Sequence, residues 1–138
     1  MSNTEQNKLD KDTSISTSIA PWLTFLNCAI AVDFYKAAFD ADEVYRLETP
    51  DGGLVVKLSI NGAEFWLSNG TTDKGNLPEA VGGETIRMIL TVQNPDPIFE
   101  KALKAGASEV FPIGEDYGWR LGRIVDPFGL HWEIGHPL

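Results

Sequence analysis

Hydrophobic and polar residues alternate along several short segments of the chain, which is the pattern of strands with one buried face. In the first half, these segments are Ile19–Leu26, Ala41–Glu48, Leu54–Ile60 and Ala63–Ser68. The segment Ala29–Phe39 instead carries its apolar residues at helical spacing and follows Asn27, a residue suited to capping a helix. The pattern therefore predicts the order β-α-β-β-β for the first half.

The same order of elements returns in the second half. A helix is predicted to begin at Asn94–Pro97 and to end before Gly106, because proline suits the first turn and glycine the residue after the end. The strand segments are Thr85–Val92, Ser108–Ile113, Trp119–Val125 and Leu130–Gly135. Residues 71–83 contain glycine and proline and predict a linker. Two such units, each a sheet covered by a helix on one face, can enclose a cavity.

The last two strands flank the turn Asp126-Pro127-Phe128-Gly129, in which proline suits the second position and glycine accepts a positive φ. After the turn, alternation places His131 and Glu133 on one face and apolar residues, including Trp132, on the other. We expect Trp132 to pack against a helix. A face that carries an imidazole and a carboxylate must be solvated, paired or bound to a ligand.

Composition and charge narrow the class of protein. The 138 residues are 43% hydrophobic, which predicts one folded domain with an ordinary core. Residues 1–18 are polar without an apolar period and are predicted to form a disordered arm; the domain is residues 19–138, with modules of about 19–70 and 84–138. The net charge of −9 argues against a nucleic-acid partner and is compatible with a neutral or cationic one.

The single cysteine, Cys28, excludes an internal disulfide and a cysteine-based metal cluster, and it fits a reducing compartment. We expect it to be a buried apolar thiol. No apolar run approaches the roughly 20 residues that span a membrane, and the N-terminus lacks the pattern of a secretion signal. The expectation is a cytoplasmic protein without a membrane partner.

The duplicated plan and three sequence blocks resemble the vicinal oxygen chelate superfamily, which includes glyoxalase I, bleomycin-resistance proteins and extradiol dioxygenases. The blocks are Phe34-Tyr35 followed by Phe39; Ala102-Leu103 with Ala105-Gly106-Ala107; and Tyr117–Arg123 leading into Asp126–Gly129 and Trp132-Glu133. The last two resemble the subgroup related to the phosphonate-operon protein. The resemblance covers roughly residues 19–135. It implies an α+β fold in which two βαβββ modules form a curved mixed sheet around a half-barrel cavity, and it implies a homodimer.

Metal-dependent members of the superfamily bind a divalent ion in this cavity, and their last-strand ligand is usually glutamate, which corresponds to Glu133. The other ligand positions supply no donor and fall near Ala20, near Val55 or Val56, and at Arg87. A catalytic site of this kind needs about three protein ligands. We therefore expect no cofactor. The alternative is a shifted divalent-metal site made of His131, Glu133 and Glu64.

Arg87 is predicted to take the place of the metal. Alternation along its strand points Arg87 into the cavity that Glu133 also faces. A guanidinium and a carboxylate there would pair, bidentately where the geometry allows, because either charge alone would be uncompensated. The alternative is that Arg87 reaches solvent at the barrel mouth and Glu133 is hydrated.

Aromatic residues provide further candidates. Trp22 and Trp66 are expected on the cavity faces of their strands beside Lys57 and Glu64, where they suit a flat or cationic ligand or else fill the barrel. Trp119 is placed to line the mouth. Arg120 is a candidate for holding a ligand carboxylate or phosphate, or for a structural ion pair, for which the partners would be Asp116 or Asp126.

The sequence thus predicts a metal-free protein that binds a small organic ligand, cationic or aromatic, as the bleomycin-resistance proteins that it resembles sequester cationic drugs. The candidate ligand-binding residues are Trp22, Lys57, Glu64, Trp66, Arg87, Trp119, Arg120 and Glu133. The rival is a divalent-metal-dependent lyase, isomerase or dioxygenase of the glyoxalase type, with Glu133 and His131 as catalytic candidates. A third class is a partner-binding module without a ligand.

Overall fold

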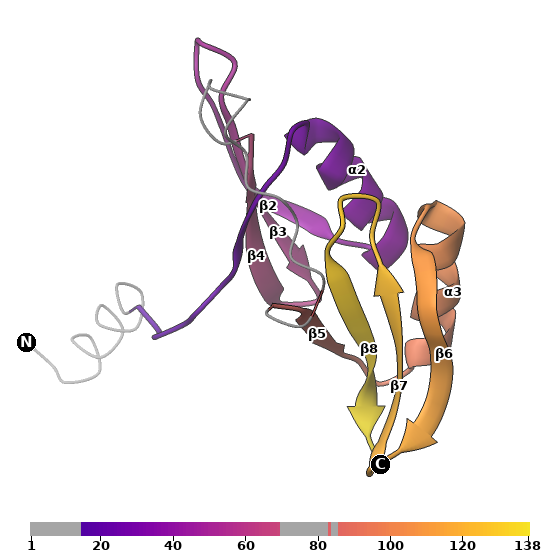
Figure 1. The fold of residues 1–138 in the computed structure, drawn as a ribbon. Coiled ribbons are helices and arrows are strands. Elements are labelled where there is room, and N and C mark those ends of the chain that lie inside the picture. Colours follow the sequence, from indigo (N-terminus) through magenta and orange to yellow (C-terminus); the bar gives the residue numbers. More distant parts are fainter. Residues whose placement is uncertain (1–14, 70–82, 84–85) are drawn as a thin grey trace, which may run out of the picture.

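The computed structural model describes residues 15–69, 83 and 86–138, and it contains the two predicted β-α-β-β-β modules (Figure 1). The first module consists of β1 (Trp22–Thr24), α2 (Cys28–Phe39), β2 (Asp42–Glu48), β3 (Leu54–Ile60) and β4 (Ala63–Ser68). The second consists of β5 (Met88–Thr91), α3 (Pro95–Ala105), β6 (Ser108–Asp116), β7 (Trp119–Val125) and β8 (His131–Pro137). Residues 1–14 of the predicted arm and 71–82 of the predicted linker lie outside the described residues.

Each module forms one mixed four-stranded sheet, and the two sheets have equivalent topologies. The strand orders are β1-β4-β3-β2 and β5-β8-β7-β6. In each sheet the first strand pairs in parallel with the last, and the remaining pairs are antiparallel. The predicted α+β fold class with duplicated modules is confirmed.

Local chemistry explains where the helices begin and end. The side chain of Asn27 accepts a hydrogen bond from the backbone N–H of Ile30, so it caps α2 as predicted. Gly106, at φ 124°, ends α3, where its N–H donates back to the last turn. The two-residue turn Asn61-Gly62 has φ values of 50° and 99° and closes the β3–β4 hairpin.

Strand β6 is longer than the sequence predicted. The predicted strand ends at Ile113, yet Gly114 pairs with Leu121 and Asp116 with Trp119. The turn Tyr117-Gly118, with φ values of 50° and 80°, joins the two strands. The antiparallel pairing therefore extends to the turn, with shifts in register between Glu109 and Gly114.

The helix-facing sides of both sheets share one hydrophobic core. Helices α2 and α3 lie side by side (Figure 1), and aromatic rings of the first module contact those of the second. The ring centroids of Phe39 and Trp132 lie 4.8 Å apart, and those of Phe25 and Phe128 lie 5.0 Å apart. Trp132 is 3% exposed and Cys28 is fully buried, so both predictions of burial are confirmed.

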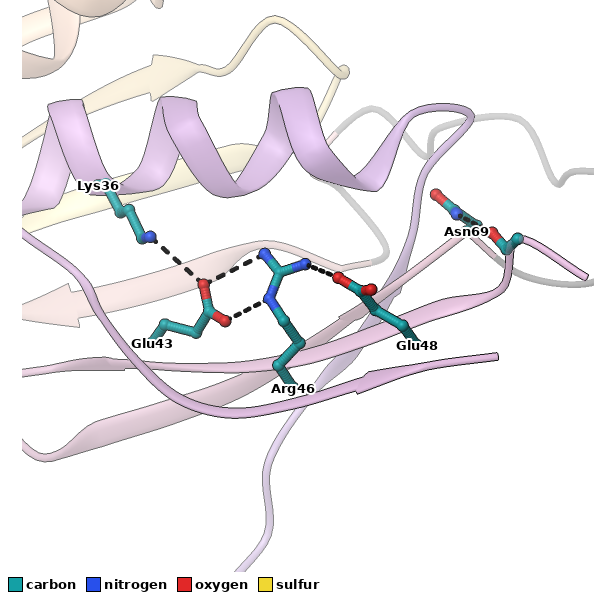
Figure 2. A network of polar contacts seen from close by, with 6 residues as sticks. Lys36, Glu43, Arg46, Glu48 and Asn69 are labelled. Atoms are coloured by element: carbon teal, nitrogen blue, oxygen red, sulfur yellow. Dashed lines mark hydrogen bonds and ion pairs between the residues drawn. The ribbon is translucent and has the colours of Figure 1, made fainter. Parts of the chain in front are cut away.

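A network of ion pairs lies between α2 and the edge strand β2 of the first module (Figure 2). Lys36 lies 3.3 Å from Glu43, and Arg46 contacts both Glu43 and Glu48. Hydrogen bonding from Arg46 lowers the pKa of Glu43. Because Lys36, Arg46 and Glu48 remain accessible to solvent and Glu43 is partly exposed, we expect each pair to contribute little to stability.

Within the described ranges, neither helix has the length and apolar character needed to cross a membrane.

Candidate functional site

An ion pair joins the segment before β5 to strand β8 on the face of the second sheet that the helices do not cover. Nε of Arg87 donates to Oε2 of Glu133 at 2.7 Å, and Nη1 donates to the carbonyl of Gly83 at 3.1 Å. The predicted pairing of Arg87 with Glu133 is confirmed. Nε is the guanidinium nitrogen that contacts the carboxylate, while Nη1 is engaged by the backbone.

A second arginine, Arg123, flanks the same carboxylate. Arg123 lies opposite Glu133 in the β7–β8 pairing, and its Nη2 is 3.9 Å from Oε1. Its guanidinium also lies over the ring of Phe111, 5.5 Å from the centroid. Within residues 15–69, 83 and 86–138, Nε of Arg123 and Nδ1 of His131 are buried without a hydrogen-bond partner. Sequence reasoning assigned no ligand role to Arg123, although counting outward from the hairpin turn would have placed it beside Glu133.

A groove of about 510 Å³ runs along this face. Its lining includes three acidic and three aromatic residues, namely Glu115, Asp116, Glu133, Phe111, Tyr117 and Trp119. The carboxylate of Glu115 contacts Arg120 instead of the groove. A smaller hollow of about 270 Å³ adjoins it and shares Trp119, Leu121 and Glu133. We call the two together the β7–β8 groove. Aromatic walls beside carboxylates favour a flat organic cation.

Four of the predicted ligand-binding residues gather on the first sheet instead. Trp22 and Trp66 are stacked, with centroids 6.0 Å apart and planes at 24°. Lys57 Nζ lies 4.9 Å from the Trp66 ring centroid and 3.0 Å from Glu64, and Tyr45 contacts Trp66 edge-on at 5.6 Å. The structure thus brings these residues together with each other, while Arg87, Trp119 and Glu133 form a separate group on the second sheet.

The predicted ion-pair partners of Arg120 are corrected. Its Nε lies 3.0 Å from Asp96 at the start of α3, and its Nη1 lies 3.3 Å from Glu115. Neither Asp116 nor Asp126 is its partner, because the guanidinium reaches the helix rather than the neighbouring turns. Hydrogen bonding from Arg120 lowers the pKa of Asp96.

Asp126 is a buried structural centre that the sequence indicated only as a turn residue. It is 4% exposed. Its carboxylate accepts hydrogen bonds from the hydroxyl of Tyr35 at 2.6 Å, the indole of Trp132 at 2.9 Å, and the backbone N–H groups of Phe128 and Leu130 at 3.0 and 2.9 Å. Burial, and secondarily the charge of Asp126, raise the pKa of Tyr35 well above its usual value.

The residues present do not fit the divalent ion that the fold family implies. Arg87 cannot ligate and occupies Oε2 of Glu133, while Glu64 is paired with Lys57 on the other sheet. In the part of the chain that the structure describes, no three His, Cys, Asp or Glu residues are grouped to hold a metal ion. The shifted site of His131, Glu133 and Glu64 is therefore not assembled.

No family model matches the sequence. Curated mycobacterial proteins do resemble it over most of its length. Uncharacterized protein Mb0911c of Mycobacterium bovis is 38% identical over 132 residues, which cover 91% of this chain and 86% of the relative. Uncharacterized protein Rv0887c of Mycobacterium tuberculosis is also 38% identical over 132 residues, covering 91% of this chain and 77% of its own length.

Solved structures share the fold at lower identity. A glyoxylase/bleomycin resistance protein/dioxygenase domain from Frankia sp. matches with a TM-score of 0.69 and 19% identity, covering 91% of this chain and all of that domain. TioX from Micromonospora sp. matches with a TM-score of 0.67 and 23% identity, and the match covers 88% of this chain and 100% of TioX. The fosfomycin resistance protein FosX from Listeria monocytogenes matches with a TM-score of 0.65 and 17% identity, and the match covers 90% of this chain and 95% of FosX. These likenesses establish the fold.

Proposed function

We propose that this chain, which belongs to the same family as Mb0911c and Rv0887c and has the glyoxalase/bleomycin resistance/dioxygenase fold, binds a planar organic cation in its β7–β8 groove without a metal ion. The observation that supports this most directly is the groove itself. It combines the rings of Phe111, Tyr117 and Trp119 with the carboxylate of Asp116. Aromatic faces attract cations, and the carboxylate adds charge complementarity.

The Arg87–Glu133 ion pair supports the metal-free part of the proposal. By the resemblance, Arg87 stands at the position of a ligand in metal-dependent members of the superfamily. Its guanidinium engages Glu133, which corresponds to their last-strand ligand. The carboxylate is 13% exposed, so a charge partner is needed whether or not a ligand is bound. Arg87 supplies that partner from within the chain.

The names of proteins with this fold also favour drug-like ligands. FosX is a fosfomycin resistance protein, and the Frankia protein is a glyoxylase/bleomycin resistance protein/dioxygenase domain. Binding of a small organic molecule is therefore compatible with the fold. Which molecule is bound depends on the side chains of the groove, since one fold hosts many functions.

A homodimer is part of the proposal. Trp22, Tyr45 and Leu47 leave 54%, 45% and 46% of their surfaces exposed, and exposed apolar patches of this kind favour association. Light scattering after size-exclusion chromatography should give about twice the chain mass of 15.2 kDa. If the protein is a monomer at every concentration tested, the proposed homodimer is wrong, while the proposed ligand binding is unaffected.

Dye binding tests the central claim. Rhodamine 123 and fluorescein share a xanthene ring system but carry opposite charges, and fluorescence anisotropy reports binding of either. We expect saturable binding of rhodamine 123 and none of fluorescein at about 100 µM protein. Trp119→Leu should weaken rhodamine 123 about tenfold and Asp116→Asn about threefold. Asp33→Asn, the same change on the exposed face of α2, is the matched control and should bind like the wild type.

Three outcomes would overturn all or part of the proposal. If rhodamine 123 fails to bind, or if fluorescein binds equally well, the groove does not select planar cations. If protein purified without a chelator contains stoichiometric nickel, zinc, iron or manganese, the metal-free part is wrong. The alternative, a metal-dependent enzyme of the glyoxalase type with Glu133 and His131 as catalytic candidates, would then be favoured.

A further inference from the structure

The carboxylate of Glu133 lies between two guanidinium groups. Arg87 lies 2.7 Å from one of its oxygens and Arg123 lies 3.9 Å from the other. One negative charge therefore faces two positive ones at this end of the β7–β8 groove. The other end, beside the Tyr117-Gly118 turn, is acidic, because Asp116 lines it there. The groove is thus polarised along its length.

Arg123 has hydrogen-bonding capacity that the described residues do not use. Its side chain is 14% exposed, and its buried Nε donates to no acceptor among the residues that the structure describes. A buried guanidinium N–H without an acceptor is costly, since such groups are almost always satisfied by protein, water or ligand. The longer distance to Glu133 leaves the carboxylate mainly with Arg87. Arg123 therefore has a positive charge and an unused N–H donor, both of which favour binding of a further oxygen acceptor.

Arg123 is also held in position beside the groove. Its guanidinium lies over the ring of Phe111, and both Phe111 and Glu133 line the groove. Strand pairing between β7 and β8 positions its backbone opposite Glu133. A preorganised guanidinium loses less conformational freedom on binding than a mobile one, and its fork geometry matches a carboxylate.

From these contacts we infer that Arg123, with Arg87 as its neighbour, forms a subsite for a carboxylate or another oxygen anion at the inner end of the groove. The inference rests on the proposed function and names its ligand class: an amphoteric aromatic molecule. The cationic ring system lies against Trp119 and the acidic end, and the anionic group binds Arg123. A purely cationic ligand would offer the basic side chains no partner, and a purely anionic ligand would offer the acidic ones no partner.

A matched pair of dyes tests the inference. Rhodamine 110 carries a free carboxylate, and rhodamine 123 is its methyl ester with the same cationic ring system. We expect the wild type to bind rhodamine 110 about tenfold more tightly than rhodamine 123. The preference runs against long-range electrostatics, because a protein of net charge −9 favours the dye with the higher positive charge. Anisotropy titrations give both dissociation constants.

Variants of Arg123 assign the preference to this side chain. Arg123→Gln should remove the preference by weakening rhodamine 110 about tenfold while changing rhodamine 123 less than about twofold. Arg123→Lys keeps the positive charge but loses the two-pronged geometry of the guanidinium, so it should retain part of the preference for rhodamine 110. Arg46→Gln, a change of the same kind in the exposed network of Figure 2, is the control and should keep the wild-type preference.

The outcomes separate this inference from the proposed function. If the wild type binds rhodamine 123 as tightly as rhodamine 110, the inferred carboxylate subsite is wrong while the proposed cation binding stands. This comparison uses the wild type alone, so it does not depend on the folding of any variant. If Arg123→Gln retains the preference, the subsite is not at Arg123. If neither dye binds, the proposed function fails and the inference fails with it.

Discussion

The hydroxyl of Tyr35, on α2 of the first module, lies 2.6 Å from Oδ2 of Asp126, at the turn between β7 and β8 of the second. Tyr35 is fully buried and Asp126 is 4% exposed. The same oxygen accepts the indole N–H of Trp132 at 2.9 Å. One buried carboxylate thus connects the helix of the first module with the hairpin that carries Glu133, and it couples the stability of the fold to the position of the site.

Replacing Tyr35 by phenylalanine should therefore destabilise the protein. The variant removes one donor to a buried carboxylate and preserves the packing of the ring. We expect the free energy of unfolding to fall by about 1–3 kcal/mol in urea denaturation at neutral pH. Tyr45→Phe is the matched control, because Tyr45 is 45% exposed, and it should change stability by less than about 0.5 kcal/mol. Equal stability of both variants would contradict the role assigned to the bond.

The buried thiol of Cys28 predicts a loss of stability at alkaline pH. Burial raises the pKa of Cys28 from 9.0 to about 11. Because the folded-state pKa lies above the unfolded-state value, the stabilisation is fully present below about pH 9 and is lost as the pH rises toward about 11. The unfolding free energy of the wild type should fall more steeply across this window than that of Cys28→Ala. Parallel pH profiles would show that the thiol does not contribute.

Local patterns in the sequence predicted most of the fold. The bounds of β3, β4 and β7 agree with the prediction to the residue, because alternation is regular there and β3 and β4 are joined by the Asn61-Gly62 turn. Strand β1 is shorter than predicted, since its apolar run continues beyond the residues that pair with β4. The alternation of apolar and polar residues predicts which face of the sheet a side chain occupies. The length of a strand depends instead on its pairing with a neighbouring strand.

The candidate site was predictable only in part. Alternation and the resemblance predicted that Arg87 and Glu133 face one another. The partners of Arg120 depend on how α3 docks, and those of Asp126 include Tyr35, 91 residues away in the chain. Such contacts follow from the packing of one module on the other. A local pattern holds no information about that packing, so Asp126 could be recognised only as a turn residue.

Breaking the Arg87–Glu133 pair should destabilise the protein more than breaking an exposed pair. Arg87→Ala leaves Glu133, which is 13% exposed, with only the longer contact to Arg123. We expect the melting temperature to fall and the unfolding free energy to decrease by about 1–2 kcal/mol. Arg46→Ala removes an arginine from the exposed network of Figure 2 and should cost less than about 1 kcal/mol.

An unchanged melting temperature for Arg87→Ala would count against the pair. The double variant Arg87→Ala/Glu133→Gln provides a second measurement, because removing the charge of Glu133 should recover part of the lost stability. If the two substitutions are additive, the side chains do not interact in solution.

Gly135 is predicted to be the least tolerant position in the floor of the β7–β8 groove. It is buried on β8 opposite Leu121. A Cβ atom added there would meet the carbonyl oxygen of Arg120 at 2.2 Å and Cβ of Leu121 at 2.5 Å. Backbone cannot yield cheaply, so β7 and β8 would have to separate. Gly135→Ala should lower the unfolding free energy by at least about 1–3 kcal/mol in urea denaturation.

Gly114 provides the matched control for this substitution. It also lies in a strand of the second sheet, but a Cβ added there meets no atom within 4 Å. Gly114→Ala should therefore leave stability within about 0.5 kcal/mol of the wild type. If Gly135→Ala is tolerated equally well, the close approach of β7 and β8 that forms the groove floor is wrong. Equal losses in both variants would instead indicate a general cost of replacing glycine in this sheet.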